Sequence, residues 1–275
     1  MRFHGVISAL LLVASHYTCA CPTQPDEREV AADQSPILNG GQVTINTYDY
    51  VPTNGPLTWH KTSGNGLCRT GTRQSPILLG SDIRQTDVGD VQFSAPDAVG
   101  KLEHRGTGIE VKEVKGTLKY AARTYELDNF HFHTPSEHRI HQEHYPVEMH
   151  MVHKDTTGKR LVLGFVIQLS TTQCSSLPHV ALAKAGQISP GQDVMTSTLQ
   201  FDEIAYYASH KQFYSYGGSL TTPPCTEDIQ WLVGTEPLHL DVGTYNALKH
   251  AVKYNSRIIQ NSPGSTNSIQ LACSP

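Results

Sequence analysis

The sequence lacks an excess of positive charge and a hydrophobic run long enough to cross a membrane. Lysines and arginines number 21 against 25 aspartates and glutamates, so the formal net charge is -4. Nucleic-acid-binding faces are usually basic, and disordered tails combine low hydrophobicity with high net charge, whereas 38% of this chain is hydrophobic. The apolar run at residues 6–14 is too short to span a bilayer. We expect no nucleic-acid partner and no membrane span, and the oligomeric state stays open.

Cys-x-x-Cys spacing is also absent, although the chain has six cysteines. Arg2, the apolar residues 6–14 and the following residues 15–20 have the pattern of a secretory signal peptide. Its removal would leave five cysteines in an oxidising compartment, where disulfides persist: Cys21, Cys68, Cys174, Cys225 and Cys273. Covalent cross-links are a better interpretation than metal ligands, and an odd number leaves one thiol over.

The chain divides into three predicted segments. Residues 1–20 are the signal peptide, residues 21–43 are polar and acidic and predict a flexible leader or pro-segment, and residues 44–275 form one domain. No Asn-x-Ser/Thr acceptor occurs, so N-linked glycan is not expected. We predict a secreted or extracytoplasmic location.

Hydrophobic residues recur mostly at period two, which predicts strands. Apolar side chains alternate through residues 109–120, and a turn at Gly116 predicts a hairpin. Residues 160–169 and 228–233 are apolar runs of the length of central strands. Helical patterns are few and lie at residues 178–185, 201–207 and 244–254. The fold class is therefore α+β, dominated by strands, with short peripheral helices.

The histidines carry most of the functional signal, because neutral imidazole is the commonest metal ligand. His131 and His133 share one face of a predicted strand, since successive side chains point to opposite faces. If a second strand at residues 147–153 returns antiparallel, His150 faces the same cavity. Three histidines around zinc leave a fourth position for water, as in catalytic sites. By itself this pattern also fits ordinary exposed histidines on strands.

Four other histidines lie close to these in sequence. His138, His141 and His144 fall in a polar connection, where His141 and His144 are expected to be solvated. His153 follows His150 by three residues and points to the opposite face of a strand. We exclude all four from the predicted metal site.

Four further motifs accompany the histidines, in an order and spacing that resemble the alpha-class carbonic anhydrases over roughly residues 44–260. The form of residues 134–138, Thr-Pro-Ser-Glu-His, resembles secreted microbial, fungal and plant members more than animal cytosolic ones. The four motifs are Asn54-Gly55-Pro56 with Trp59, Gln74-Ser75-Pro76-Ile77, Ser136-Glu137-His138, and Gly-Ser-Leu-Thr-Thr-Pro-Pro-Cys at residues 218–225.

The resemblance implies zinc-dependent, reversible hydration of carbon dioxide to bicarbonate and a proton by zinc-bound hydroxide. It also implies a single domain built on a large central, mostly antiparallel twisted sheet. The zinc ligands would be His131, His133 and His150. Thr221 matches the threonine that accepts the hydrogen of the hydroxide, and Glu137 matches the carboxylate that accepts the threonine proton. This chain of hydrogen bonds would point an oxygen lone pair at carbon dioxide.

The resemblance also assigns an apolar substrate wall and two groups that orient the ligands. Carbon dioxide has no net dipole, so it is held by excluding water. Glu148 matches the carboxylate that holds the third ligand. Asn129 stands where many relatives have glutamine, so its hydrogen bond to His131 is either direct with a shifted backbone or lost. The substrate-binding residues would be Val152, Val162, Leu220, Thr222 and Trp231.

Cys68 and Cys225 match the disulfide of extracytoplasmic relatives, which would hold the Thr221 loop. Ser75-Pro76 and Pro223-Pro224 match bonds that are cis in the family. The pairing of the other three cysteines stays open, and a bridge from Cys174 to Cys273 rests on elimination only.

One departure from the family concerns the rate. Many fast members carry a histidine that moves the product proton to buffer, and the matching position here is Thr107, which cannot relay a proton near neutrality. His104 or Glu110 would have to substitute through water. We therefore expect moderate turnover with a strong dependence on external buffer.

Three other functions are compatible with parts of this pattern. A catalytically silent binding protein would usually lack one or more ligand histidines. A small-ester hydrolase would use the same zinc chemistry, as a side activity. A structural zinc site would need a fourth protein ligand, and no cysteine is near the three histidines in sequence.

Overall fold

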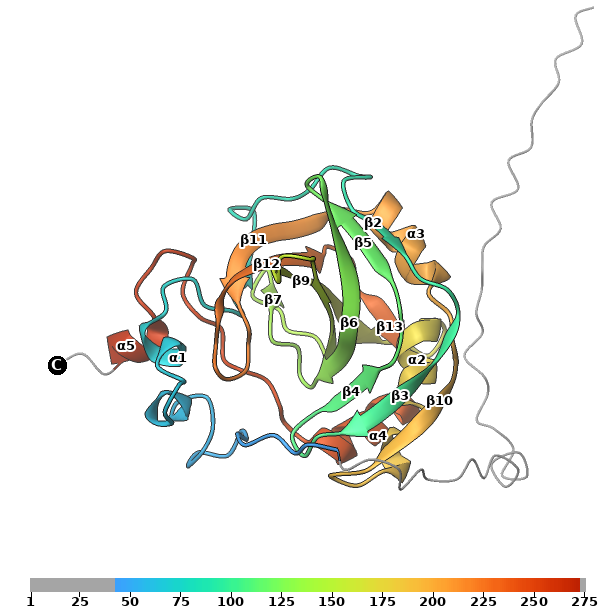
Figure 1. Ribbon diagram of the computed structural model, residues 1–275, viewed down its shortest axis with the longest axis horizontal. Coiled ribbons are helices and arrows are strands. Elements are labelled where there is room, and N and C mark those ends of the chain that lie inside the picture. Colours follow the sequence, from blue (N-terminus) through green and yellow to red (C-terminus); the bar gives the residue numbers. More distant parts are fainter. Residues whose placement is uncertain (1–42, 273–275) are drawn as a thin grey trace, which may run out of the picture.

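The computed structural model describes residues 43–272 (Figure 1). The predicted signal peptide and the predicted leader up to residue 42 lie outside the described residues, as does Cys273. Val43, assigned above to the leader, is 7% exposed and packs as part of the folded chain.

A twisted sheet of 11 strands dominates the fold, and the predicted fold class is confirmed. Its main path runs β10-β3-β4-β6-β8-β9-β12-β11, while β2 and β5 extend it beside β6 and β13 pairs with β9. All pairs in it are antiparallel except β12 and β13 with β9. The strands are β2 Gln92–Ser94, β3 Ala98–His104, β4 Ile109–Lys112, β5 Thr117–Tyr120, β6 Arg123–His133, β8 Val147–Lys154, β9 Arg160–Leu169, β10 Asp193–Leu199, β11 Phe213–Ser219, β12 Glu227–Gly234 and β13 Leu238–Leu240. A separate parallel pair joins β1 Leu78–Leu79 to β7 Arg139–Ile140.

The hairpin predicted around Gly116 is wrong. β4 and β5 do not pair with each other; both pair with β6, one after the other along its length. Between the partners Val111↔Phe130 and Thr117↔Glu126 the β4–β5 side has extra residues, and Glu113 adopts a positive φ of 63°. The chain bulges there and continues in the same direction. The true reversal follows β5, at Ala121 and Ala122, which both have positive φ.

Helices are short and lie outside the sheet, as predicted. In Figure 1, α2 and α4 lie beside β3 and β10, α3 lies beside β2, and α1 and α5 lie at the other end of the molecule. The Asp241 side chain accepts a hydrogen bond from the Thr244 amide and so starts α4 two residues earlier than the hydrophobic pattern indicated. The helices are η1 Trp59–Lys61, α1 Leu67–Thr70, α2 Ser176–Leu182, η2 Ala185–Gln187, α3 Asp202–His210, α4 Val242–Val252 and α5 Ser268–Ala272.

Two hydrophobic clusters pack on opposite faces of the sheet. The larger one joins strand residues such as Phe130 and Phe165 to Leu182 of α2 and Leu248 of α4. The smaller one contains Trp231 and its neighbours on β9 and β11. The strands β6, β8 and β9 lie in the middle of the sheet and carry buried side chains on both faces.

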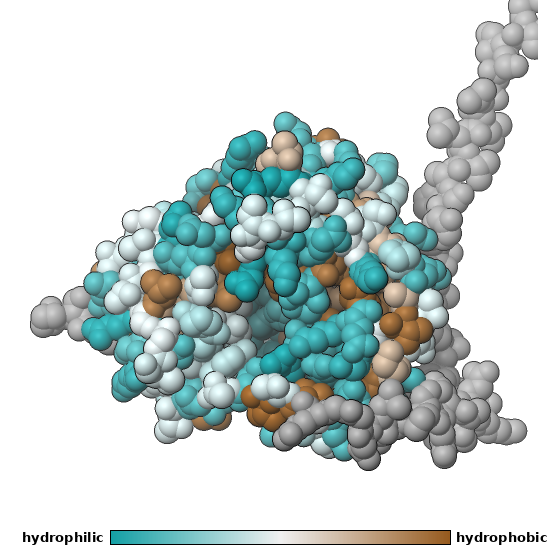
Figure 2. Space-filling model, viewed as in Figure 1, coloured by the Kyte–Doolittle hydropathy of each residue, from teal (hydrophilic) through white to brown (hydrophobic). Residues whose placement is uncertain are grey.

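No helix among residues 43–272 is long and apolar enough to cross a membrane. The face shown in Figure 2 is mostly hydrophilic, carries small separate apolar patches and is hollowed near its centre.

Candidate metal centre and active site

Three histidines converge on one face of the β6–β8 pair. His131 lies directly opposite His150 in the antiparallel register, and His133 lies two residues further along β6. Ring centroids are 5.2 Å apart for His131 and His133, 5.4 Å for His131 and His150, and 4.6 Å for His133 and His150. Their ligand nitrogens all lie within 4.8 Å of one another. The register therefore brings together the three residues that the sequence pattern placed on one face.

A protein acceptor orients the His131 ring. Its Nδ1 lies 3.1 Å from Asn129 Oδ1, so the nitrogen that carries the proton is Nδ1 and Nε2 faces its neighbours. Asp128 is an extra residue in β6, because Leu127 pairs with His153 while Asn129 pairs with Val152. The shorter Asn129 side chain therefore makes the direct hydrogen bond to His131, next to a bulge of β6 at Asp128.

The other two rings are fixed in the same way. His133 Nδ1 donates to the Asn255 carbonyl oxygen at 2.8 Å, and its Nε2 is buried without a hydrogen-bond partner. His150 Nε2 donates to Glu148 Oε1 at 2.6 Å, which leaves its Nδ1 toward the cluster. Each ring thus directs one lone pair to a common centre.

Burial and mutual repulsion favour the neutral form of all three rings. Burial lowers the pKa of His133 and His150, and the pKa of His131 is well below its ordinary value because of burial and then the charges of His133 and His150. Metal ions bind neutral imidazole, so the cluster is in its ligand form at neutral pH.

Glu148 is buried and accepts four hydrogen bonds. Besides His150, its carboxylate receives the His138 Nδ1–H at 2.6 Å and the backbone amides of Glu137 and His138 at 2.9 and 2.8 Å. The pKa of Glu148 is held well below its ordinary value by His138 and His150, although burial acts in the opposite direction as the largest influence. Tyr216 lies 2.6 Å from the other nitrogen of His138, so both His138 nitrogens are engaged.

Glu137 and Thr221 lie beside this centre. Glu137 Oε1 accepts a hydrogen bond from the Arg257 amide at 2.8 Å, and Oε2 lies 3.9 Å from His150 Nδ1. Burial raises the pKa of Glu137 to about 7, against the lowering influence of His150 and of the Thr221 side chain. No hydrogen bond of ordinary geometry reaches Oε2, so we regard Thr221 as adjacent to the carboxyl rather than tightly bonded to it.

A cavity of about 290 Å³ opens in front of the histidines. Val152, Leu220 and Thr222 line it together with His131 and His133.

Two of the proposed wall residues lie behind this cavity. Val162 and Trp231 do not line it; they are buried behind it, where Val162 pairs with both Val152 and Trp231 across three neighbouring strands. Trp231 packs edge-on against His150, with ring centroids 4.8 Å apart. These two side chains support the wall instead of forming its surface.

A disulfide joins Cys68 to Cys225, with Cα atoms 5.1 Å apart. It ties α1 to the loop that carries Thr221, across a sequence separation of 157 residues. The peptide bonds before Pro76 and Pro224 are cis, as is Thr134-Pro135, which the motifs did not indicate.

The three residues considered for proton transfer do not all lie at the cavity: Thr107 and Glu110 line it, whereas His104 does not. Thr107 lines the cavity and accepts a hydrogen bond from Asn46 Nδ2 at 2.9 Å. His104 is 2% exposed, and its Nδ1 accepts a hydrogen bond from the Gly106 amide. His104 does not line the cavity, so the prediction that it could replace the missing proton-carrying histidine is wrong. Glu110 does line it, paired with Arg105 at 2.9 Å.

Sequence reasoning missed Asn255 and Arg257. The Asn255 side chain accepts from the Thr134 amide and donates to the Phe132 carbonyl, while the buried Arg257 donates to the carbonyls of Ser75 and Cys68. Both follow α4 in an irregular segment, more than a hundred residues from their partners. No local pattern marks such residues.

Tyr48 was also missed. It is half-buried at the cavity, beside Thr222, and burial raises its pKa to about 12. Its phenol is therefore neutral across the physiological range.

Comparisons with known proteins identify the family to which this chain is similar. A family model described as eukaryotic-type carbonic anhydrase matches residues 54–263. A carbonic anhydrase of Neisseria gonorrhoeae is 33% identical over 222 residues, covering 78% of this chain and 84% of its own. One of Nostoc sp. is 30% identical over 228 residues, covering 79% and 83%. The solved structure of a fungal alpha carbonic anhydrase from Aspergillus oryzae has a TM-score of 0.80 at 38% identity, covering 83% of this chain and 99% of that one.

Proposed function

Because this chain belongs to the alpha carbonic anhydrase family, we propose that it hydrates carbon dioxide reversibly to bicarbonate and a proton at a zinc ion held by His131, His133 and His150. The convergence of three imidazoles on one point at the base of the cavity is the observation that carries this proposal.

The donor set fits zinc. The buried Nε2 of His133 has no protein partner, and the acceptors that fix the other ring nitrogens give each imidazole one free lone pair. Among residues 43–272 this group contains three ligands, which fits a catalytic site better than a structural one with four. Zinc, when bound, would act as a Lewis acid that lowers the pKa of a coordinated water to about 7, a value for which carbonic anhydrase is itself the reference case.

Thr221 and Glu137 would orient the attacking oxygen. Thr221 would accept a hydrogen bond from that oxygen and donate its own proton to the unbonded Oε2 of Glu137, whose Oε1 is held by the Arg257 amide. This arrangement removes rotations that would turn the attacking lone pair away from carbon dioxide. In this role Glu137 must be ionised, and a bound metal ion would favour that form against the burial that raises its pKa.

Val152 and Leu220 would hold carbon dioxide against the metal site, with Val162 and Trp231 behind them and Thr222 at the edge of the cavity. A small apolar surface suits a substrate without a net dipole, because it excludes water from the reacting carbon. Hydrolysis of small esters at the same site would be a minor activity.

The disulfide indicates an oxidising, extracytoplasmic location. We propose that residues 1–20 direct the chain there as a signal peptide and that residues 44–275 are the catalytic domain.

Stopped-flow measurement of carbon dioxide hydration, with zinc counted on the same sample, tests the proposed function. We expect one zinc per chain, loss of activity on chelation and recovery on adding zinc back. His150→Ala should lose zinc and more than about a hundredfold of activity, since even groups that only orient a ligand contribute 10- to 100-fold. His144→Ala, an exposed histidine in the connection before β8, is the matched control and should behave like the wild type.

Two outcomes would contradict the proposal. Zinc bound without activity would favour a silent binding protein, and full activity in zinc-free protein would remove the metal from the reaction.

A further inference from the structure

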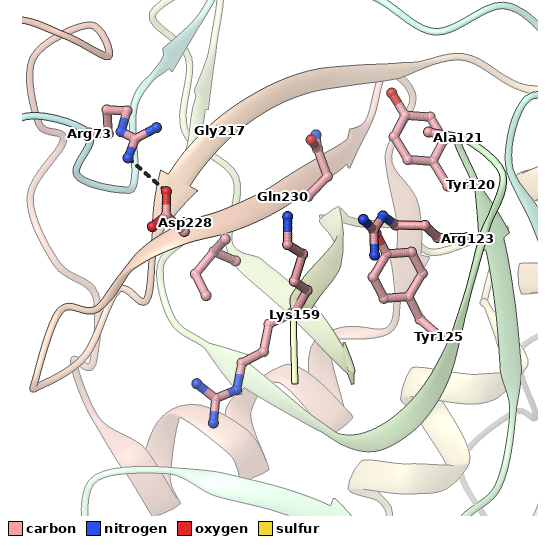
Figure 3. A pocket seen from close by; sticks show the side chains of 11 residues that line it. Arg73, Tyr120, Ala121, Arg123, Tyr125, Lys159, Gly217, Asp228 and Gln230 are labelled. Carbon is pink, nitrogen blue, oxygen red and sulfur yellow. Dashed lines mark hydrogen bonds and ion pairs between the residues drawn. The ribbon is translucent and has the colours of Figure 1, made fainter. Parts of the chain in front are cut away.

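A second cavity, of about 510 Å³, lies beside the histidine cavity and contains none of its histidines. The reversal between β5 and β6, the turn between β8 and β9, and strands β11 and β12 form its walls (Figure 3). Arg160, the first residue of β9, lines both cavities. The larger cavity is therefore a neighbour of the active site and not part of it.

Positive charge dominates the walls of this cavity. Arg73, Arg123, Lys159 and Arg160 line it, against one carboxylate, Asp228. The whole chain has a formal net charge of -4, so four cations to one anion is a local reversal of its charge balance.

Ion pairs neutralise only part of this charge. Arg73 Nη2 pairs with Asp228 at 2.7 Å, and Arg123 Nη1 pairs with Asp155 at 2.8 Å. Each guanidinium has five N–H donors, so both keep donors for another partner, and their side chains are 50% and 45% exposed. Within residues 43–272, the Lys159 amine and the Arg160 guanidinium form no ion pair with a carboxylate.

The side chains of Arg73, Arg123 and Lys159 are arranged around a common space, and Arg160 lies at the border with the histidine cavity. In Figure 3 the Lys159 amine extends toward Gln230, between the Arg73–Asp228 pair on one side and Arg123 on the other. Tyr120 and Tyr125 stand beside Arg123 and supply an aromatic wall.

We propose that this cavity binds a doubly charged oxyanion of the phosphate or sulfate class. Two unpaired cations match two negative charges, and the remaining arginine N–H groups suit the oxygens of a tetrahedral anion. The cavity is larger than one such anion requires and falls in the range of small-molecule sites, so a sugar that carries the anionic group also fits. The aromatic wall would contact the sugar ring. This inference does not depend on zinc or on the proposed hydration reaction.

Isothermal titration calorimetry at fixed ionic strength tests the inference, with inorganic phosphate, glucose 6-phosphate and glucose as separate ligands. We expect one saturable site for both phosphates and none for glucose. Tighter binding of glucose 6-phosphate would identify an anionic sugar as the ligand, and equal binding would identify the free anion.

The deciding variant is Lys159→Gln with Arg160→Gln, which should weaken phosphate binding about tenfold or more, because charge-assisted hydrogen bonds are the strong ones. The control, Lys61→Gln with Lys115→Gln, changes the net charge equally at exposed lysines outside the cavity and should leave binding unchanged. If the double variant fails to fold, Lys159→Gln alone, in the exposed turn, should show a smaller loss in the same direction.

Equal weakening in the pocket variant and the control would assign the binding to general charge and overturn the inference. The absence of a saturable site for either phosphate in the wild-type protein would overturn it too.

Discussion

The two faces of the β6–β8 strand pair carry histidines in different settings. On the cavity face, His131, His133 and His150 direct free nitrogens at one another, and a protein acceptor fixes each ring. On the opposite face, His153 packs edge-on against Phe93 at 5.9 Å, and its Nδ1 donates to the Met151 carbonyl at 2.9 Å.

Burial alone does not distinguish the two faces, because His133, His150 and His153 are all at most 2% exposed. Burial favours the neutral ring in each case, and it lowers the pKa of His153 to about 4. The difference lies in convergence: a lone neutral imidazole is core packing, whereas three that share a centre can bind a metal ion.

The largest effect is expected from Glu148→Gln on the cavity face. An amide cannot accept four hydrogen bonds from His138, His150 and two backbone amides, and its own N–H groups would face donors. We expect the free energy of unfolding to fall by about 3 to 5 kcal/mol and zinc affinity to fall about 10- to 100-fold. Urea unfolding and competition with a chelator measure the two effects.

Glu143→Gln is the matched control for this substitution, because Glu143 is exposed in the connection before β8. Equal unfolding midpoints and zinc affinities in both variants would mean that Glu148 holds neither the ligand nor the fold.

Much of the cavity face could be predicted from the sequence. Period two fixes which residues share a face, so the grouping of His131 with His133 and the exclusion of His153 follow from local pattern. The antiparallel return that brings His150 to the same face was only a condition at the sequence level, and the structure meets it. Residues that act across the chain could not be found in this way, because Asn255 and Arg257 reach the site from an irregular segment after α4.

The errors in the fold have a similar cause. Alternation through residues 109–120 identified two strands but not their pairing, because a bulge at Glu113 and a reversal give the same local pattern around Gly116. The basic cavity joins turns that are distant in sequence and leaves no periodic signal.

The second prediction concerns the core face and pH. The folded state holds the pKa of His153 at about 4, below its ordinary 6.5, so the folded state binds fewer protons than the unfolded state in this range. Its contribution to stability is complete above pH 6.5 and is lost as the pH falls toward 4. The free energy of unfolding should fall by about 3 kcal/mol over this range. His153→Leu should remove this part of the pH dependence.

Urea unfolding of zinc-free protein at pH 7 and pH 4.5 measures the effect. Because His131, His133 and His150 also titrate with lowered pKa values, the relevant quantity is the difference between wild type and variant at the two pH values. A difference that does not change with pH would show that His153 is not buried in its neutral form.

The smallest effect is expected at the edge of the cavity, from Thr107→His. An imidazole there would carry the product proton to buffer, so turnover in weak buffer should rise about tenfold, below the range of a fully positioned general acid or base. Thr107→Val loses the same hydrogen bond from Asn46 without gaining an imidazole, so its turnover in weak buffer should not rise. Added imidazole should accelerate the wild type and Thr107→Val more than Thr107→His, because the histidine variant already has an internal proton carrier. If imidazole accelerates none of the three, proton transfer does not limit turnover, and the threonine at this position has no bearing on the rate.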